Sequence, residues 1–355
     1  MRGGNHLNEW GKLPTDEVGT NEQLGHVTAV FQKQYRVMTA DGETLSELSG
    51  KMRFEALTKA ELPAVGDWVI QSEREVGKGR IERILPRTSQ FSRKAAGTEI
   101  EEQIICANVD VALLVMAFGH DFNVRRLERY LTVAWEAGVK PLIVLTKKSL
   151  IDNVDDLLSE IDEIVFGTPY FAVDSLTGEG LDALKDVLQP RETIVLVGSS
   201  GVGKSTLVNA LAGEQLMETG GVREDDERGR HTTTHRELKR LTNGLLLVDT
   251  PGMRELGLWD GSEGLASTFS DIEMLAKSCR FRDCQHGGEP GCAVQAALAN
   301  ESLSHERWES FLKLKREMAY AERKQNVALQ AAEKEKWKKI HKQAQARTKL
   351  KYQKR

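Results

Sequence analysis

The sequence predicts an α/β domain built around a phosphate-binding loop, with a small β-barrel before it and a cysteine-rich helical segment after it. Three observations predict this order. Residues 198–205 read Gly-Ser-Ser-Gly-Val-Gly-Lys-Ser, a full match to G-x-x-x-x-G-K-S. Residues 22–86 contain short segments of alternating polarity separated by turn residues. Residues 279–292 contain three cysteines and one histidine.

The composition indicates a globular protein without a membrane span. A length of 355 residues predicts two or three domains, and a hydrophobic fraction of 40% is sufficient for buried cores. The chain has no apolar run of about 18 residues or more, so we expect no span. Residues 1–10 are polar and lack the apolar core of a signal peptide. We therefore expect a cytoplasmic protein with reduced cysteines.

Charge is distributed unevenly along the chain. The formal net charge is −4, but residues 323–355 contain 12 Lys and Arg against 2 Glu, so this tail carries +10 and the rest carries −14. A charge run is often only a solvated face. Trp337 and Tyr352 lie among these cations, which favours binding to RNA phosphates. We predict a basic RNA-binding tail over 323–355.

The N-terminal part has the pattern of a β-domain. We expect residues 1–21 to be flexible and residues 22–90 to form the barrel. The expected strands are Gly25–Gln32, Tyr35–Thr39, Gly50–Leu57, Gly66–Gln71 and Gly79–Leu85. Five such strands fit a closed barrel of the OB type, which often binds RNA or single strands. A β-domain without such a ligand is the alternative, because fold alone does not fix function.

Residues 91–262 alternate between apolar strands and amphipathic helices. The expected strands are Val109–Phe118, Pro141–Thr146, Tyr170–Val173, Thr193–Val197 and Leu245–Val248. The expected helices are Val124–Ala137, Val154–Ile164 and Gly180–Leu188. This alternation predicts a parallel sheet covered by helices on both faces. Ligands of such sheets bind at the carboxyl ends of the strands, where the phosphate-binding loop falls.

The phosphate-binding loop has the strand before it and the helix after it that the motif requires. Its backbone N–H groups and the positive end of the helix dipole bind phosphate oxygens. We expect Lys204 to reach the β- and γ-phosphates and Ser205 to ligate Mg²⁺. The predicted phosphate contacts are Gly198, Ser199, Ser200, Gly201, Val202, Gly203, Lys204, Ser205 and Thr206.

Two further segments complete the predicted phosphate side. Residues 247–252 read Leu-Val-Asp-Thr-Pro-Gly, which places Asp249 to hold Mg²⁺ through water and the Gly252 N–H to meet the γ-phosphate. Residues 229–234 read Gly-Arg-His-Thr-Thr-Thr. There Thr233 is the candidate to bind Mg²⁺ only when the γ-phosphate is present, which makes a switch. A surface turn is the alternative for this run.

The segments expected to read the base precede the phosphate-binding loop. Residues 146–149 read Thr-Lys-Lys-Ser where a GTPase carries N-K-x-D, and residues 174–176 read Asp-Ser-Leu where a GTPase carries S-A-x. This order indicates a circularly permuted GTPase domain, with the same sheet cut at another surface loop. The predicted base contacts are Thr146, Lys147, Ser149, Ser175 and Leu176.

Position 149 departs from the GTPase pattern. The Asp of N-K-x-D accepts two hydrogen bonds from guanine, whereas Ser149 has one hydroxyl and no charge. Losing the carboxylate costs about 1.5–3 kcal/mol, or about 10- to 100-fold in guanine discrimination. Asp152, three residues on, lies too far around the start of the expected helix to substitute, and Lys147 can still pack over the base plane. The sequence predicts GTP as the nucleotide, with weaker affinity or relaxed purine specificity.

The cysteines near the C-terminus have metal-ligand spacing. Cys279, Cys284, His286 and Cys292 form C-x4-C-x-H-x5-C, which suits a closed tetrahedral zinc site. Structural cysteines with an incidental histidine, or a disulfide, are the alternatives. Four protein ligands leave no open position, so we expect a structural zinc ion. Cys106 lies in an apolar stretch and is expected in the core.

These features together resemble the RsgA (YjeQ) family of circularly permuted ribosome-assembly GTPases. The resemblance covers residues 25–315 and includes Val65–Val69, Ile105–Asp110 and Met253–Glu255 beside the motifs above. It implies a GTPase that binds the small ribosomal subunit late in maturation and is stimulated by it. The barrel and a zinc domain, residues 263–322, would contact rRNA. A monomer using GTP, GDP and Mg²⁺ is the simplest expectation.

The resemblance also bears on catalysis. Met253 stands where many GTPases carry a water-orienting Gln, so a polar group must come from elsewhere. His231 is the candidate, since the family's H-T-T-T segment makes the same assignment, and a neutral imidazole accepts a hydrogen bond from water. Lys204 and Thr233 complete the predicted catalytic set; contact with RNA or solvent is the alternative for His231. An RNA-binding module with a slow, degenerate nucleotide switch remains the alternative function.

Overall fold

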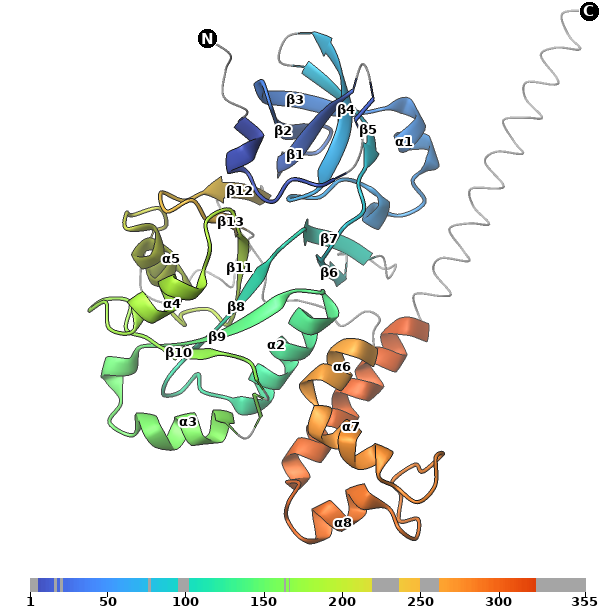
Figure 1. Cartoon of the computed structure of the whole chain (residues 1–355), viewed down its shortest axis with the longest axis vertical. Helices are drawn as coiled ribbons and strands as arrows, with labels where there is room; N and C mark the ends of the chain where they lie inside the picture. The colour runs from blue at the N-terminus through green and yellow to red at the C-terminus, as the bar shows by residue number, and fades with distance from the viewer. Residues whose placement is uncertain are drawn as a thin grey trace, which may run out of the picture.

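The computed structural model describes residues 6–15, 18–19, 22–75, 78–94, 102–162, 164–165, 167–218, 236–249 and 262–323. Three parts follow one another along the chain (Figure 1): a β-barrel, a helix-covered sheet and a group of C-terminal helices. Short 3₁₀ turns supplement them at η1 (His6–Glu9), η2 (Lys59–Glu61) and η3 (Lys148–Leu150). Within the described ranges, no helix combines the length and the apolar character needed to cross a membrane.

The N-terminal part is a closed five-stranded barrel, as the sequence predicted. Its strands are β1 (Gln23–Val30), β2 (Tyr35–Thr39), β3 (Gly42–Leu48), β4 (Trp68–Glu75) and β5 (Lys78–Ile84). They follow the order β1-β2-β3-β5-β4, and β1 also pairs with β4, which closes the barrel. Only β3 and β5 run parallel. Val27, Val37, Val69 and Ile81 fill the interior and are fully buried.

One strand prediction in the barrel was wrong. Residues predicted as the strand Gly50–Leu57 form helix α1 (Gly50–Glu55). The cause is local, because the Ser49 hydroxyl accepts a hydrogen bond from Met52 N at 3.2 Å and caps the first turn. The third strand is instead β3, where exposed and partly buried residues alternate so that its apolar signal is weak.

The central part is a parallel sheet with helices on both faces. Strands β8 (Val111–Ala117), β9 (Lys140–Thr146), β10 (Tyr170–Ala172), β11 (Thr193–Val197) and β13 (Leu246–Asp249) take the order β10-β9-β8-β11-β13. Helices α2 (Val124–Glu136) and α3 (Val154–Asp162) cover one face, and α4 (Leu181–Val187) and α5 (Lys204–Ala212) the other (Figure 1). These strands and helices match the predicted ones closely.

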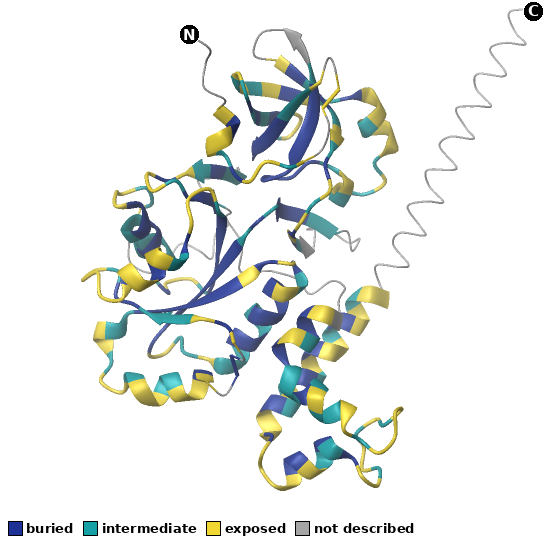
Figure 2. Cartoon of the chain, in the orientation of Figure 1, coloured by how far each residue is buried: buried dark blue, intermediate teal, exposed yellow. Residues whose placement is uncertain are grey.

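Alternate side chains of β8 enter opposite cores. Leu114 shares one core with Leu127 of α2, while Leu113 shares the other with Leu184 of α4 and Leu207 of α5. All seven residues of β8 are buried. Figure 2 shows the same layering, with β8 dark blue, the edge strand β10 teal and the outer faces of α3 and α4 largely yellow. Burial on both faces explains why these strands are apolar without interruption.

Strand β12 (Arg236–Arg240) joins the sheet to the barrel. It pairs antiparallel with β13 on one side and with β1 on the other, so that one continuous sheet spans both parts. Arg36 of β2 forms an ion pair with Glu237 of β12 across this junction. A separate two-stranded sheet consists of β6 (Gln90–Lys94) and β7 (Glu102–Ala107). Cys106 in β7 is fully buried, as predicted, and burial raises its thiol pKa to about 12.

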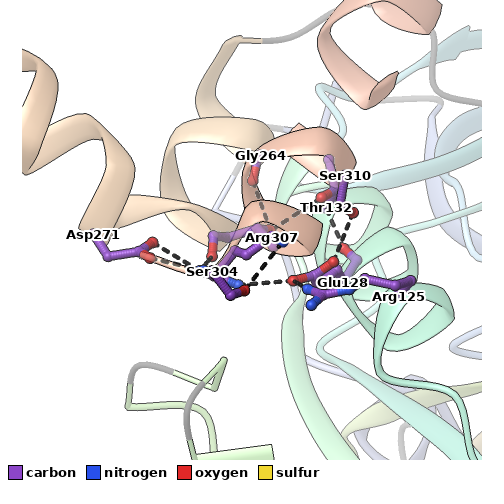
Figure 3. Close-up of polar contacts among 9 residues, drawn as sticks. Arg125, Glu128, Thr132, Gly264, Asp271, Ser304, Arg307 and Ser310 are labelled. Carbon is purple, nitrogen blue, oxygen red and sulfur yellow. Dashed lines mark hydrogen bonds and ion pairs between the residues drawn. The ribbon is translucent and has the colours of Figure 1, made fainter. Parts of the chain in front are cut away.

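The C-terminal helices meet the central part where α6 (Ser262–Thr268) packs against α2. The others are α7 (Ser270–Lys277), α8 (Ala293–Ala299) and a helix over 305–323. The buried Arg307 guanidinium anchors them (Figure 3): it donates to Glu128 of α2 at 2.9 Å and to both Asp271 carboxylate oxygens at 2.7 Å. Ser310 donates to the second oxygen of Glu128 at 2.6 Å. Arg125 of α2 also pairs with Glu128, at 2.6 Å, so the buried charge of Glu128 is paired from both sides of the contact.

Candidate nucleotide site and metal centre

The phosphate-binding loop depends on its glycines. It connects β11 to α5 at the carboxyl end of the sheet. A Cβ on Gly198 would lie 2.2 Å from the carbonyl oxygen of Val115 in β8, so no side chain fits there. Gly201 and Gly203 have φ values of 77° and 94°, in the region that glycine adopts without strain. The loop can therefore turn tightly over the strand ends and present its N–H groups.

The predicted phosphate contacts lie together at the start of α5. Lys204 Nζ donates to the carbonyl oxygen of Gly198 at 2.7 Å and to that of Ser199, so its ammonium lies over the loop. Ser205 and Thr206 follow in the first turn of the helix. Ser199 Oγ also accepts a hydrogen bond from Arg126 of α2. Sequence reasoning missed Arg126, since only the fold brings α2 to the loop.

Two predicted base-reading residues contact the same loop. Thr146 ends β9, and its hydroxyl donates to the carbonyl oxygen of Val202. Lys147 adopts a left-handed backbone with φ 63°, and its Nζ donates to the carbonyl oxygen of Gly201 at 2.7 Å. The two segments are more than 50 residues apart in sequence. The structure therefore brings the predicted base and phosphate sides into direct contact.

Ser149 is bonded to a residue that the sequence analysis did not assign. Its hydroxyl donates to Oδ2 of Asp174, while Oδ1 of Asp174 accepts from Leu176 N at 2.9 Å and Thr177 N at 3.1 Å. The hydrogen bond from Ser149, followed by that from Thr177, lowers the pKa of Asp174 to about 2. Ser175 Oγ is buried without a partner in the described part of the chain, and Leu176 is 86% exposed.

Asp249 lies at the same edge of the sheet. It is the last residue of β13, two positions beyond Leu247, which pairs in register with Ile194 of β11. Lys239 of β12 donates to its carboxylate at 2.7 Å. The other predicted residues of this side, Thr233, His231 and Gly252, lie outside the described residues.

The predicted metal ligands converge in the C-terminal part. The ligand atoms of Cys279, Cys284, His286 and Cys292 all lie within 4.8 Å of one another. Three of the separations are 3.9 Å from Cys279 Sγ to Cys292 Sγ, 3.6 Å from Cys279 Sγ to His286 Nδ1, and 3.4 Å from His286 Nδ1 to Cys292 Sγ. A tetrahedron with metal–sulfur bonds of about 2.3 Å has edges of about 3.8 Å. The cluster is therefore able to hold one metal ion.

The surroundings orient these ligands. His286 has φ 59°, Gln295 Nε2 donates to its carbonyl oxygen at 2.6 Å, and Trp308 packs edge-on against its ring at 5.8 Å between centroids. Cys292 is the N-cap of α8 and accepts from Gln295 N. A Cβ on Gly291 would lie 3.0 Å from Arg280 Cβ, so the loop closes tightly beside the cluster.

Comparisons with known proteins agree with the permuted order of these segments. Residues 84–259 match the family model described as RsgA GTPase. The small ribosomal subunit biogenesis GTPase RsgA 1 of Listeria innocua is 48% identical over 326 residues, 92% of this chain and 92% of the relative. The chain belongs to the RsgA GTPase family. An RsgA 1 protein of the same description from Oceanobacillus iheyensis is 45% identical over 324 residues, 91% and 92% of the two chains.

Solved RsgA-like structures have the same fold. The crystal structure of YjeQ from Thermotoga maritima covers 84% of this chain and 99% of its own, with a TM-score of 0.63 and 28% identity. That of YloQ, described as a circularly permuted GTPase, covers 86% and 98%, with a TM-score of 0.58 and 26% identity. The predicted permutation of the GTPase domain is therefore confirmed.

A second family model, described as ABC transporter, matches residues 181–350. That range contains the phosphate-binding loop, a motif that many nucleotide-binding proteins share. The RsgA relatives extend over 92% of the chain and include the barrel, so they decide the family. As a member of the RsgA GTPase family, the chain is a GTPase, and the enzyme interpretation prevails over that of a degenerate switch.

Proposed function

We propose that this GTPase acts in the maturation of the small ribosomal subunit, binding its rRNA and hydrolysing GTP to GDP and phosphate with stimulation by the subunit. The observation that carries the proposal is the 48% identity, over 92% of both chains, to a relative named for small-subunit biogenesis. The contact between the base-reading and phosphate-binding segments supports it, because both halves of a nucleotide site meet in one place.

The residue roles form part of the proposal. Lys204 would stabilise the β- and γ-phosphates, and Ser205, Thr233 and Asp249 would hold Mg²⁺. His231 orients the attacking water in place of the absent Gln. Mg²⁺ supplies charge neutralisation between the phosphates when it is bound. Asp249 supports this assignment, because it ends the strand beside β11 at the loop's edge of the sheet.

We assign contact with rRNA to three segments. These are the barrel over residues 22–90, the metal-binding helical part over 263–322, and the tail over 323–355 with its net charge of +10. The GTPase domain, residues 91–262, lies between the barrel and the metal-binding part in sequence. Cations that neutralise rRNA phosphates release counterions, so binding should weaken steeply as salt rises. We propose that a monomer in the cytoplasm performs this function.

We further propose that Cys279, Cys284, His286 and Cys292 hold one structural zinc ion. The donor set of three thiolates and one imidazole suits Zn²⁺, and the short distances between the ligand atoms support the assignment. A closed four-ligand site leaves no position for substrate, so the ion stabilises the helices around it and performs no chemistry.

Co-sedimentation with purified small ribosomal subunits tests the proposed partner. The full chain should pellet with subunits when loaded with a non-hydrolysable GTP analogue and be released with GDP, because the γ-phosphate orders the switch segments. A chain that ends at Glu322 should bind with a shallower dependence on salt, since it lacks the cations of the tail. Equal, salt-insensitive recovery in both nucleotide states, or no recovery in either, would contradict the proposal.

A further inference from the structure

The two positions that read the base in other GTPases have exchanged their chemistry here. A GTPase carries a carboxylate at the last position of N-K-x-D and a hydroxyl at the first position of S-A-x. This chain carries a hydroxyl at the former, Ser149, and a carboxylate at the latter, Asp174. The site therefore keeps one hydroxyl and one carboxylate, on the opposite strands.

The fold places these two side chains in direct contact. Strands β9 and β10 are parallel neighbours with Leu145 opposite Ala172, and both residues follow shortly after these strands end. Ser149 Oγ donates to Asp174 Oδ2, and Ser149 N lies 3.4 Å from the same oxygen. The other carboxylate oxygen is held by Leu176 N and Thr177 N. Asp174 is thus fixed in one orientation, with one oxygen committed to Ser149.

Asp174 and Ser149 differ in burial, and this gives the two side chains different roles. Asp174 is 3% exposed, whereas Ser149 belongs to the exposed residues of its segment. An ionised carboxylate only accepts hydrogen bonds, and a hydroxyl has one proton and two lone pairs. The hydrogen bonds around Asp174 lower its pKa to about 2, which keeps it ionised near neutrality. Ser149 must then give its only proton to Asp174, and its lone pairs are left as acceptors on the exposed side.

We propose that Asp174 is a positioning residue for guanine selection, which acts by holding the hydroxyl proton of Ser149 so that Ser149 Oγ accepts from the guanine base. Guanine presents two donors on this edge, the N1–H and the 2-amino group. Adenine presents an acceptor at N1, and xanthine a carbonyl at C2. An oxygen that can only accept hydrogen bonds, and that lies beside a negative charge, favours guanine over adenine and xanthine. The chain would thereby keep guanine preference without an aspartate at position 149.

This inference rests on the proposed function only in taking GTP as the nucleotide. It replaces the expectation of relaxed purine specificity that Ser149 alone suggested. The competing interpretation is that Asp174 merely closes the turn through Leu176 N and Thr177 N, as aspartates often do. A turn-closing role alone would change stability and leave base preference unaltered, so base preference is the property to measure.

The experiment measures affinity for GDP and for xanthosine diphosphate by titration calorimetry, using the full chain without ribosomes. Asp174→Asn and Ser149→Ala should each lower the ratio of GDP to xanthosine diphosphate affinity by about 10- to 100-fold, the value of one charge-assisted hydrogen bond. Asp174→Asn retains the oxygen that closes the turn. Ser149→Ala alters an exposed position, so folding is not at risk there.

A variant that exchanges the two residues, Ser149→Asp/Asp174→Ser, provides the sharpest comparison. Asp174→Ser alone should lose the preference, and Ser149→Asp alone should place two carboxylates together, which raises the cost of ionising both. The double variant Ser149→Asp/Asp174→Ser should recover a ratio within about threefold of the parent chain, because it restores the usual arrangement. An unchanged ratio in both single variants of the previous test would overturn the proposal. A folded exchange variant no better than Asp174→Ser would overturn it too.

Since no ribosomal subunits are present, this test reads base selection alone. A chain that prefers GDP yet fails to bind subunits would refute the proposed function and leave this inference standing. If the chain binds subunits but the variants keep the base preference of the parent chain, the proposed function stands and this inference is refuted.

Discussion

Gly66 packs directly against the main-chain carbonyl of Ala107. A Cβ on Gly66 would lie 2.1 Å from that oxygen, and its φ of +87° belongs to the left-handed region. Asn108 Nδ2 also donates to the carbonyl oxygen of Gly66 at 2.8 Å. The turn before β4 of the barrel is thereby held against the strand that leads into the GTPase sheet. Two segments that supported the family resemblance are therefore neighbours in space.

Substituting Gly66 by Ala should destabilise the chain. The new methyl group meets a backbone oxygen that cannot rotate away, and the backbone is strained for alanine, so we expect a loss of about 2–4 kcal/mol in the free energy of unfolding. Gly42→Ala is the matched control, since Gly42 also has a positive φ, 120°, but nothing lies within 4 Å of its Cβ position. It should cost about 1–2 kcal/mol. Equal losses in urea unfolding would argue against the close contact.

Much of the fold could be predicted because its elements carry strong local signals. The sheet strands are buried on both faces and therefore apolar throughout, as in Val111–Ala117. The phosphate-binding loop could be predicted equally well from the spacing of its glycines and lysine. Strand β12, in contrast, reads Arg-Glu-Leu-Lys-Arg, and it is a strand only because β1 and β13 flank it. No periodicity in the sequence indicates that such a segment is a strand.

The candidate site was predictable to a similar extent. The metal ligands and Lys204 follow from spacing, since the chemistry fixes the interval between residues. The roles of Asp174 and Arg126 depend on partners far away in sequence, Ser149 and Ser199, and could be found only from the fold. The misassigned strand at Gly50 reflects a cap, Ser49, that outweighed a weak alternation.

Removing the metal should unfold the C-terminal helices. We expect about one zinc ion per chain by elemental analysis. Chelation should lower the melting temperature, because binding of a structural metal ion contributes free energy to folding. Cys292→Ser should lose the ion. Cys106→Ala should keep it, since Cys106 is a core residue in β7 away from the cluster. Full thermal stability in a zinc-free chain would show that the four residues serve another purpose.

Acid should destabilise the barrel through His26. Its ring is buried, stacks on Trp68 at 4.2 Å between centroids, and bonds the carbonyl oxygen of Gly66 through Nε2. Burial lowers its pKa from 6.5 to about 4. The unfolded chain therefore binds a proton that the folded chain does not, and stability falls as the pH drops from about 6.5 to about 4, by up to about 3 kcal/mol.

The variant His26→Phe tests this pH dependence, because it keeps an aromatic ring against Trp68 and removes the titrating group. Its free energy of unfolding should vary less between pH 7 and pH 4 than that of the parent chain. Identical slopes in the two proteins would mean that His26 does not contribute.

The most direct measurement of the central claim is GTP hydrolysis by the full chain with and without purified small ribosomal subunits. We predict that subunits raise the rate by at least about tenfold with GTP and not with ATP, since stabilising groups and an ordered switch are worth several kcal/mol in such reactions. Lys204→Ala should abolish the stimulated rate, and His231→Ala should remove most of it. A rate that subunits leave unchanged, although the chain binds them, would contradict the account.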